Sequence, residues 1–539
     1  MNINTSKILN TYLGPKGYSI WKKDLTLQEL NDIKADLLVK PHVHGAPASN
    51  QVEFPAYRES PQKIYVPHYY GVEKFGPPKE YRISPGDNID VAFSGLLRDY
   101  QVPVVEKYLN SVLQDGDGAG VGAGGGLLEL ECAFGKTILA LNIISCLKKK
   151  TFIIVHKEFL LNQWVERIQE FLPGARIGKI QGQIIDIEDK DIVIGMLQSL
   201  SMKEYPASIF ESFGFCIIDE VHHISSEVFS NSLFKIVTKY MLGLSATMNR
   251  KDGTTKVFKM FLGPVLFKGE RNEKRDVVVR AIEYQVDDDE FNHEITDYRG
   301  NPAFSTMITK LCEYNRRTEF ILRVLQDMLI ENPLQQIMIL AHNKSILKYL
   351  HDAIEHRGIA SVGYYIGGMK EAALKQTETK KIVIATYSMA SEALDIKTLT
   401  TLIMCTPRSD IQQSIGRILR EKHSEPVVVD IIDSHELFKN QWKKRRAFYK
   451  KENYKIIYTT SKKYSTDFTQ WTTVYQPSKT CLSNKKERVG AKISNSKSKR
   501  SHSSSSCNDS DSGEEEIETV DVKNKNNLLS GKCLIQLKK

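Results

Sequence analysis

The chain has 539 residues, of which 41% are hydrophobic and 26% charged, and its formal net charge is +9 at pH 7. This length exceeds what one hydrophobic core supports and predicts three or four domains. No apolar run is long enough to cross a bilayer, the N-terminus lacks a secretory signal pattern, and the eight cysteines form no Cys-x-x-Cys pair, which argues against a zinc or dithiol site. We therefore expect an intracellular protein with buried free thiols.

Residues 1–90 are predicted to form a small N-terminal α+β accessory domain. Apolar residues at helical spacing predict a helix over Leu25–Leu38, which Pro41 terminates. Strands are predicted over Val52–Tyr57 and Lys63–Tyr70. The region holds no catalytic motif, so a packed accessory module is favoured slightly over a contact surface for nucleic acid or a partner.

Short apolar runs alternate with helical stretches in two further regions, residues 91–270 and 304–477. The first region contains the runs Leu127-Leu128, Phe152–Val155, Ile192–Ile194, Phe215–Ile218 and Met241–Leu244, and a helix predicted over Glu158–Phe171. The second contains Ile337–Leu340, Val362–Tyr365, Ile382–Ala385, Leu402–Cys405 and Val427–Ile432. Strands that are apolar on both faces and alternate with helices indicate parallel sheets covered on both sides, so we predict an α/β fold with two similar lobes.

Three other segments separate or follow these regions. Residues 271–303 are predicted to be a polar connector with one strand near Val277–Tyr284. The glycine-rich run Asp115–Gly126 is predicted to be a flexible loop. Residues 478–539 are rich in Ser and Lys and then acidic, which predicts a disordered tail. Before this tail, the basic run Lys443–Arg446 is interpreted either as a phosphate-binding or nuclear-targeting segment or as a solvated helix end.

A candidate phosphate loop, Glu131–Thr137, follows a short strand and opens a helix predicted over Ile138–Leu147. In such a loop the backbone N–H groups and the helix N-terminus face the phosphates. Lys136 would bind the β- and γ-phosphates of ATP, and the Thr137 hydroxyl would bind Mg²⁺. The nucleotide-binding backbone would include Ala133, Phe134 and Gly135, with alanine standing where glycine is also frequent.

An acidic pair, Asp219 and Glu220, follows the apolar strand Phe215–Ile218. Ligands of parallel sheets bind at the carboxyl ends of the strands. Asp219 is therefore predicted to hold Mg²⁺ through water, and Glu220 to orient and deprotonate the attacking water. A capped helix start is the alternative interpretation.

Residues close to this pair are predicted to couple the ATP site to the rest of the protein. His222 lies two residues beyond Glu220, and Ser245 and Thr247 follow the run Met241–Leu244. Their hydroxyls could bridge the Asp219 loop to the second lobe. Ser-Ala-Thr alone is too common a string to identify a site.

A third motif, Gln413-x-x-Gly-Arg417-x-x-Arg420, occurs far downstream. The two arginines are three residues apart and so share one helix face, and a guanidinium group suits a transferring phosphoryl group. A solvated basic face is the alternative. Upstream of the phosphate loop, the Gln101 amide could pair with the edge of adenine, with Arg98 beside it, although an ordinary helix start is also consistent.

Together, the phosphate loop, the acidic pair and the arginine motif resemble superfamily 2 helicases of the DExH type over roughly residues 91–453. Leu97–Gln101, Gly243–Asp252 and Asn315–Thr318 are most similar to the group around the transcription and repair helicase XPB and the transcript-release helicases of large cytoplasmic DNA viruses, poxviruses and their relatives. Phe54–Gly76 resembles the viral branch. Lys251 and Ala393 depart from the family pattern.

The resemblance implies two RecA-like lobes that bind ATP and Mg²⁺ in a nucleic-acid-stimulated ATPase. It implies that Asp395 couples the ATP site to the nucleic-acid track. The residues placed on that track are His156, Gln163, Gln198, Ser199, His342, Gly367, Thr386 and Glu392.

The resemblance also implies translocation on DNA, in viral transcript release or in repair. A viral RNA polymerase is the expected partner, and the host cytoplasm, the virion or the nucleus the expected location. Two alternatives stay open: an RNA helicase, and an ATP-gated scaffold that binds nucleic acid without separating strands.

Overall fold

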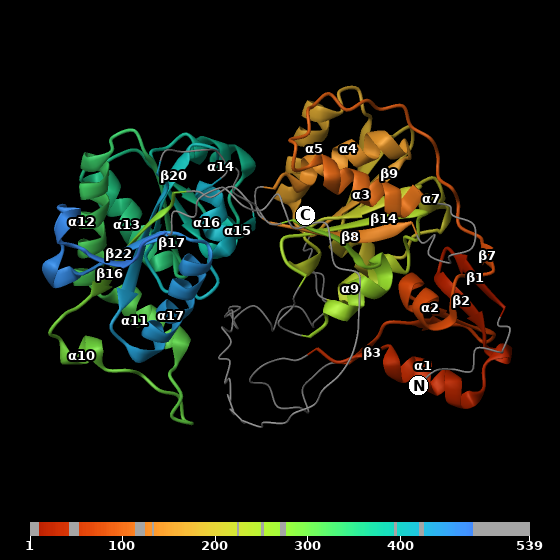
Figure 1. The fold of residues 1–539 in the computed structure, drawn as a ribbon, viewed down its shortest axis with the longest axis horizontal. Helices are drawn as coiled ribbons and strands as arrows, with labels where there is room; N and C mark the ends of the chain where they lie inside the picture. Colours follow the sequence, from red (N-terminus) through yellow and green to blue (C-terminus); the bar gives the residue numbers. More distant parts are fainter. Residues whose placement is uncertain are drawn as a thin grey trace, which may run out of the picture. The chain divides into compact units, whose positions relative to one another are not determined.

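The computed structural model describes residues 10–41, 53–113, 124–131, 134–223, 226–248, 253–269, 276–392, 396–419 and 425–477. The predicted tail, Ala133, Asp395 and Arg420 lie outside these ranges. The chain divides into two compact units, Met1–Lys274 and Arg275–Lys539 (Figure 1). None of the helices within the described ranges has the length and apolar character needed to span a membrane.

The N-terminal module is a mostly antiparallel sheet with two helices. Its strand order is β5 (Arg58–Glu59), β6 (Lys63–Val66), β2 (Gly17–Trp21), β1 (Thr11–Gly14) and β7 (Glu80–Tyr81). Helix α1 (Leu27–Asp36) confirms the predicted helix and begins at a capping box formed by Thr26 and Glu29. The predicted strand over Lys63–Tyr70 is too long, because Pro67 starts helix α2 (His68–Phe75).

The module is part of the first unit. One face of its sheet, with Tyr18, Ile20 and Ile64, shares a hydrophobic cluster with Phe152 and Phe261 of the neighbouring α/β region. A two-stranded pairing of β3 (Leu38–Val39) with β4 (Phe54–Pro55) follows α1 and replaces the longer strand predicted over Val52–Tyr57.

The first large sheet has the order β11-β10-β12-β9-β13-β14-β8-β15 and is parallel except for the hairpin of β10 with β11. Its strands are β8 (Gly125–Leu130), β9 (Thr151–Val155), β10 (Ile177–Gln181), β11 (Ile184–Asp186), β12 (Ile192–Met196), β13 (Phe215–Ile218), β14 (Tyr240–Ser245) and β15 (Val265–Gly269). Figure 1 shows α3 (Val102–Leu113), α4 (Lys136–Leu147) and α5 (Glu158–Phe171) on one side of the sheet and α9 (Thr255–Leu262) on the other. The shorter helices are α6 (Leu197–Met202), α7 (Ser208–Glu211) and α8 (Ser226–Leu233).

The end of the glycine-rich run is strand, and the prediction of a flexible loop is wrong there. Gly125 and Gly126 are buried in β8. A Cβ atom at Gly126 would lie 2.2 Å from the Leu266 side chain, so the close approach of β15 requires glycine.

The second unit contains a sheet with the order β18-β19-β17-β20-β21-β16-β22-β23, parallel except for the edge strand β23. Its strands are β16 (Val278–Tyr284), β17 (Gln336–Ala341), β18 (Val362–Tyr365), β19 (Ile382–Thr386), β20 (Leu399–Met404), β21 (Val427–Asp433), β22 (Lys455–Thr460) and β23 (Thr472–Tyr475). Its helices are α10 (Asp289–Asn292), α11 (Phe304–Glu313), α12 (Asn315–Glu331), α13 (Lys344–His356), α14 (Glu371–Glu378), α15 (Tyr387–Glu392), α16 (Gln412–Ile418) and α17 (Glu436–Lys451).

Two parallel sheets, each alternating with helices, confirm the predicted α/β fold. The strand predicted near Val277–Tyr284 is present as β16, but it does not lie in a connector between the lobes. Strand β16 pairs in parallel with both β21 and β22 and is an integral part of the second sheet.

Two buried ion pairs lie on opposite faces of β21. Arg317 of α12 donates through Nε to Asp433 at 2.6 Å, and neither side chain is exposed. Arg445 of α17 donates through Nε to Asp430 at 2.8 Å, and each side chain is 1% exposed. Arg445 is therefore not part of a solvated or phosphate-binding surface, and both interpretations of Lys443–Arg446 fail at this residue.

Candidate ATP-binding site

The predicted ATP-site residues of the first unit come from three adjacent strands. The central order β13-β14-β8 places the acidic pair, the Ser-Ala-Thr string and the phosphate loop at neighbouring carboxyl ends of parallel strands. Helices pointing their N-termini at this edge add partial positive charge there. Sequence reasoning predicted the separate motifs, and the strand order brings them together.

The phosphate loop leads into α4, which begins at Lys136 and places Thr137 in its first turn. The residue before it, Gly135, has φ of +92°, a left-handed conformation that favours glycine. A Cβ atom there would also lie 2.3 Å from the Gln101 Nε2 atom. Phe134 is buried and packs edge-on against Tyr100, with ring centroids 4.9 Å apart.

Gln101 connects this loop to the segment before α3. Its Nε2 donates to the Phe134 carbonyl at 2.8 Å, and its Oε1 accepts the Arg98 backbone N–H at 2.9 Å. Only 3% of Gln101 is exposed. The structure thus shows Gln101 holding the phosphate loop, and its contact with adenine stays a prediction. Arg98 itself donates through Nη1 to the Tyr100 hydroxyl at 2.8 Å.

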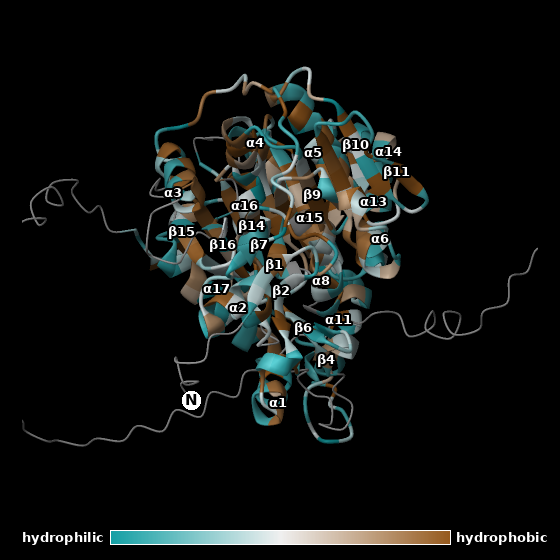
Figure 2. Cartoon of the chain, turned by 90° about the vertical axis from the view of Figure 1, so that its right-hand side faces the viewer, coloured by the Kyte–Doolittle hydropathy of each residue, from teal (hydrophilic) through white to brown (hydrophobic). Residues whose placement is uncertain are grey.

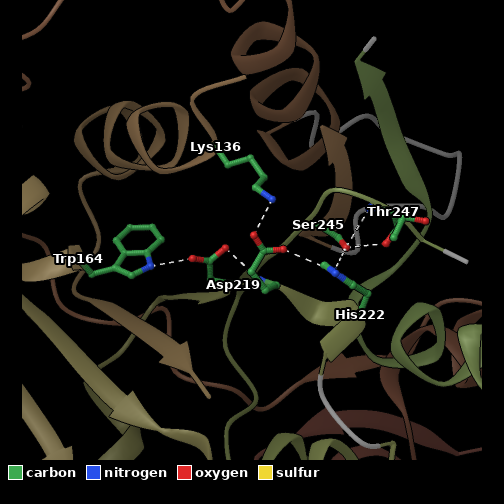
Figure 3. A network of polar contacts seen from close by, with 7 residues as sticks. Lys136, Trp164, Asp219, His222, Ser245 and Thr247 are labelled. Carbon is green, nitrogen blue, oxygen red and sulfur yellow. Dashed lines mark hydrogen bonds and ion pairs between the residues drawn. The ribbon is translucent and has the colours of Figure 1, made fainter. Parts of the chain in front are cut away.

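Lys136 and the acidic pair are in direct contact (Figure 3). The Lys136 Nζ atom lies 2.8 Å from Glu220 Oε1. Asp219 is buried, and its Oδ2 accepts the Trp164 indole N–H at 2.9 Å. Glu220 has φ of +49°, and its backbone N–H donates to Asp219 Oδ1 at 2.9 Å. The left-handed backbone conformation is unfavourable for glutamate and persists only where the surrounding structure imposes it. Residues in such conformations cluster at functional sites.

The Glu220 carboxylate also affects the ionisation of Asp219. Burial, followed by the nearby Glu220 carboxylate, raises the pKa of Asp219 to about 6 despite opposing effects of Lys136 and Trp164. A carboxylate held in this state would gain strongly from a nearby divalent cation.

His222 links Glu220 to the end of β14. Its Nδ1 atom lies 2.7 Å from the Ser245 Oγ and 3.4 Å from Glu220 Oε2. The Ser245 hydroxyl donates its one proton to the Thr247 carbonyl at 2.5 Å, so it accepts from His222 Nδ1–H. Figure 3 shows this series of contacts running from Lys136 to Thr247. Ser245 thus contacts both of the other predicted coupling residues, His222 through its ring and Thr247 through its backbone.

These residues fit a magnesium–triphosphate group. The Lys136 amine and the backbone at the start of α4 would contact the phosphates, and the Thr137 hydroxyl and the Asp219 carboxylate would be ligands of Mg²⁺. Within the described ranges no cluster of three His, Cys, Asp or Glu residues could hold a metal by itself.

Asp219→Asn is expected to stabilise the nucleotide-free protein near pH 8 while removing Mg²⁺-dependent ATP turnover. The raised pKa means that Asp219 favours the folded state fully below its unfolded value of about 4 and loses this contribution as the pH rises through about 6. Asparagine never ionises, so the gain in unfolding free energy should be on the order of 2 kcal/mol at pH 8. It should vanish near pH 4.

Hydrogen exchange of the β13 amides in both proteins, at pH 4 and pH 8, measures this difference as a local opening free energy within the full chain. Asp186→Asn, at the half-exposed end of β11, is the control. A stability gain that is independent of pH would contradict the proposed ionisation.

The predicted nucleic-acid contacts of the first unit lie at or beside the same sheet edge. His156 follows β9, Gln163 is on α5, and Gln198 and Ser199 are on α6 after β12. Gln198 is exposed, whereas the Ser199 Oγ accepts the Gly182 backbone N–H at 2.9 Å. Their contacts with nucleic acid stay predictions.

The corresponding residues of the second unit also gather at strand ends. His342 follows β17, Thr386 ends β19, and Gly367 lies just beyond β18, all on adjacent strands. His342 is not on an open surface: its Nδ1 lies 2.9 Å from the Thr406 Oγ1, and burial, with Arg408 nearby, lowers its pKa to about 3. Glu392 ends α15, and its side chain is outside the described part of the chain. Gln413 and Arg417 lie on α16, which follows β20.

Trp164 has a role that the sequence interpretation missed. Its neighbour Gln163 is predicted to lie on the nucleic-acid track, whereas Trp164 is 1% exposed and its indole N–H is bonded to Asp219 of the ATP site. A tryptophan on the apolar face of a predicted helix is expected to be buried, and its buried indole N–H then needs a hydrogen-bond acceptor. The sequence could not identify which acceptor it meets.

Comparisons with known proteins show which family the chain resembles. The family model described as "Type III restriction enzyme, res subunit" matches residues 94–250. The chain is 35% identical over 452 residues to a protein of Acanthamoeba polyphaga mimivirus named "Putative ATP-dependent RNA helicase", covering 82% of this chain and 85% of the relative. A protein of the same name from African swine fever virus (isolate Pig/Kenya/KEN-50/1950) is 28% identical, covering 61% and 69%.

A helicase-named protein of Invertebrate iridescent virus 6 is 26% identical, covering 68% of this chain and 85% of the relative. Among solved structures, similarity extends to a Saccharomyces cerevisiae Dbp5 variant bound to RNA and ADP BeF3, with 12% identity, a TM-score of 0.47, and coverage of 67% and 90%. The Hef helicase domain of Pyrococcus furiosus gives 12% identity, a TM-score of 0.44, and coverage of 65% and 98%. Because these scores are low, the assignment rests on the sequence relatives and the site, which show that the chain belongs to a family of ATP-dependent superfamily 2 helicases found in large DNA viruses.

Proposed function

We propose that this helicase uses ATP hydrolysis to translocate along DNA during viral transcription, where it releases transcripts. The observation that carries the proposal is the contact series Lys136–Glu220–His222–Ser245. It connects the residue expected to bind the phosphate to a second strand end, so that loss of the γ-phosphate would change contacts away from the reacting atoms. The similarity of Gly243–Asp252 and Asn315–Thr318 to the XPB group supports DNA as the track.

An RNA helicase is the second candidate, because the mimivirus and African swine fever virus relatives are named as RNA helicases. Contacts to the phosphate backbone do not depend on base sequence and give little discrimination by themselves. A role in transcription would imply a viral RNA polymerase as partner and action at the viral replication site in the host cytoplasm.

We expect DNA to stimulate ATP turnover in a saturable way. Phosphate release should be measured with single-stranded DNA, duplex DNA and RNA at equal nucleotide concentrations, followed by displacement of a labelled strand or nascent transcript. Stimulation by RNA alone would replace the first candidate with the second. ATP binding without phosphate release on every nucleic acid would leave only a binding scaffold.

His222→Ala tests the coupling step in the same assay. If His222 transmits the state of Glu220 to Ser245, its loss should reduce the stimulation by nucleic acid about tenfold, within the usual range of coupling free energies. The unstimulated rate should fall less. His293→Ala, an exposed histidine of the second unit, is the control. Equal loss of both rates would assign His222 to chemistry alone.

A further inference from the structure

The sheet of the N-terminal module has two unlike faces. Successive side chains along β1, β2 and β6 point to opposite faces of the sheet. On the first face, Leu13, Tyr18, Ile20, Ile64 and Val66 are buried. Several of these belong to the cluster shared with the α/β region of the same unit. Tyr12, Trp21, Lys63 and Tyr65 alternate with them and are only partly buried. The helices and the neighbouring sheet therefore cover the first face and not the second.

The second face combines aromatic rings with cations. Lys63 Nζ lies 4.0 Å from the ring centroid of Trp21 and 4.9 Å from that of Tyr12. The Arg82 guanidinium carbon lies 4.3 Å from the Tyr12 ring centroid. Lys16 stands 5.5 Å from the ring centroid of Tyr65, and Lys23 the same distance from that of Trp21. Figure 2 has the module in front, with β7, β1 and β2 drawn in teal and pale colours.

The strand register places these groups side by side. Trp21 is opposite Lys63, and the pairing of Ser19 with Tyr65 on one side and with Tyr12 on the other aligns the two tyrosines across three strands. Ser19 between them is small and almost fully buried, so the two tyrosine rings provide the accessible surface of this row. We define the aromatic–cation face as Tyr12, Lys16, Trp21, Lys23, Lys63 and Tyr65.

Charge also distinguishes this face. Among the described residues, Lys16, Lys23 and Lys63 have no carboxylate within ion-pair distance. Of the nearby acids, Glu80 is paired with Arg82 and Glu59 with Lys22 and Lys34, while Asp24 accepts the Asn10 backbone N–H. Several acids of the module, including Asp32 and Asp36, lie on α1, which packs on the other face of the sheet. The aromatic–cation face thus keeps a local positive charge.

We propose that the aromatic–cation face binds single-stranded nucleic acid, with unpaired bases stacked on the rings and phosphates beside the lysines. Every base can stack on an aromatic ring, and lysine binds phosphate whatever the base, so the site would bind single strands with little dependence on sequence. Duplex keeps its bases paired and unavailable to the rings. An acidic protein segment would satisfy the lysines but not this row of tyrosines and tryptophan. The site goes beyond the proposed motor function, because no residue of the ATP site contributes to it.

The test uses the full chain without nucleotide, with a labelled 20-nucleotide single strand of DNA and one of RNA. Trp21→Ala combined with Tyr65→Ala should raise the Kd about tenfold or more, since each stacked base contributes measurably to affinity. Tyr81→Ala is the matched control: Tyr81 is an exposed aromatic of the same sheet, but it is paired with Leu13 and so belongs to the opposite face. It should leave the Kd unchanged.

A second variant keeps the rings and removes charge. Lys16→Gln, Lys23→Gln and Lys63→Gln together should lower the slope of log K against log salt by about 2, at about 0.7 for each lost contact to a single strand. Lys34→Gln, on α1, removes one charge from the opposite side and should not change it. Unstimulated ATP turnover serves as the separate measure of the motor and should be equal in all variants.

Photocrosslinking of unsubstituted protein to a thiothymidine-containing strand gives an outcome that does not depend on a variant folding. Peptides carrying Trp21 or Tyr65 should be recovered by mass spectrometry. Unchanged Kd and salt slope in both variant sets, with crosslinks confined to other parts of the chain, would overturn the proposal. Weaker binding of an acidic peptide than of the strand supports it, and the reverse preference would replace nucleic acid with a protein partner.

Discussion

Replacing Glu220 with glutamine should lower nucleic-acid-stimulated ATP turnover by about 10²–10⁴-fold, the contribution typical of a general base. Glutamine has nearly the same shape as glutamate but cannot accept a proton from the attacking water. The substitution also removes the charge that Lys136 contacts at 2.8 Å, which should leave the lysine available for phosphate. Nucleotide binding should therefore persist while hydrolysis is lost.

The measurement is steady-state phosphate release with saturating nucleic acid, together with binding of a fluorescent ATP analogue. Glu227→Gln, an exposed glutamate on α8, is the matched control and should turn over ATP normally. Lys136→Ala should lose turnover as well, but with weaker nucleotide binding. Rapid hydrolysis by the Glu220→Gln protein would contradict the assignment of the base.

Removing Arg317 should destabilise the second unit by about 3–5 kcal/mol, because Asp433 would be left as an uncompensated buried charge. The guanidinium makes two contacts with this carboxylate, at 2.6 and 2.8 Å, and a third with the Cys405 carbonyl. Arg317→Ala therefore breaks the link between α12 and the ends of β20 and β21. The double replacement Arg317→Met with Asp433→Leu should recover most of the loss.

Unfolding of a multidomain chain is not a single transition, so the readout should be local. Hydrogen exchange of the β21 amides reports the opening free energy of this unit within the full chain. Arg357→Ala is the control. Its guanidinium also makes two contacts with a carboxylate, that of Glu319 on the same helix α12, but both groups are exposed and the effect should be small. Equal effects at the two sites would contradict the argument from burial.

Sequence patterns predicted those elements whose identity is decided locally. Strand β13 and helix α5 have the predicted bounds, because continuous apolar runs and helical spacing leave few alternatives. Strands β1 and β2 were not predicted: they are short, are joined by a tight turn, and include glycine at an end of each. Strand β16 was found, but its place between β21 and β22 in the second sheet depends on partners far away in the chain.

The candidate site divides in the same way. Lys136, Asp219 and Glu220 could be identified because each follows a strand with a characteristic spacing. The role of Trp164 could not, because its acceptor is 55 residues away. Arg445 shows the reverse error: a run of four basic residues indicates a solvated surface, yet the helix turns one of them toward Asp430. Tertiary contacts decided both cases.

The ion pair between Lys136 and Glu220 affects the order in which nucleotide binding and hydrolysis would change the contacts of Ser245. These two groups satisfy each other's charge, so a triphosphate that binds Lys136 would compete with Glu220 for the lysine. The displaced carboxylate is also the one that His222 approaches at 3.4 Å. Ser245 would therefore sense occupancy of the site first and cleavage of the phosphate bond afterwards. The contacts of Ser245 at the end of β14 would thus change twice in each cycle of ATP hydrolysis.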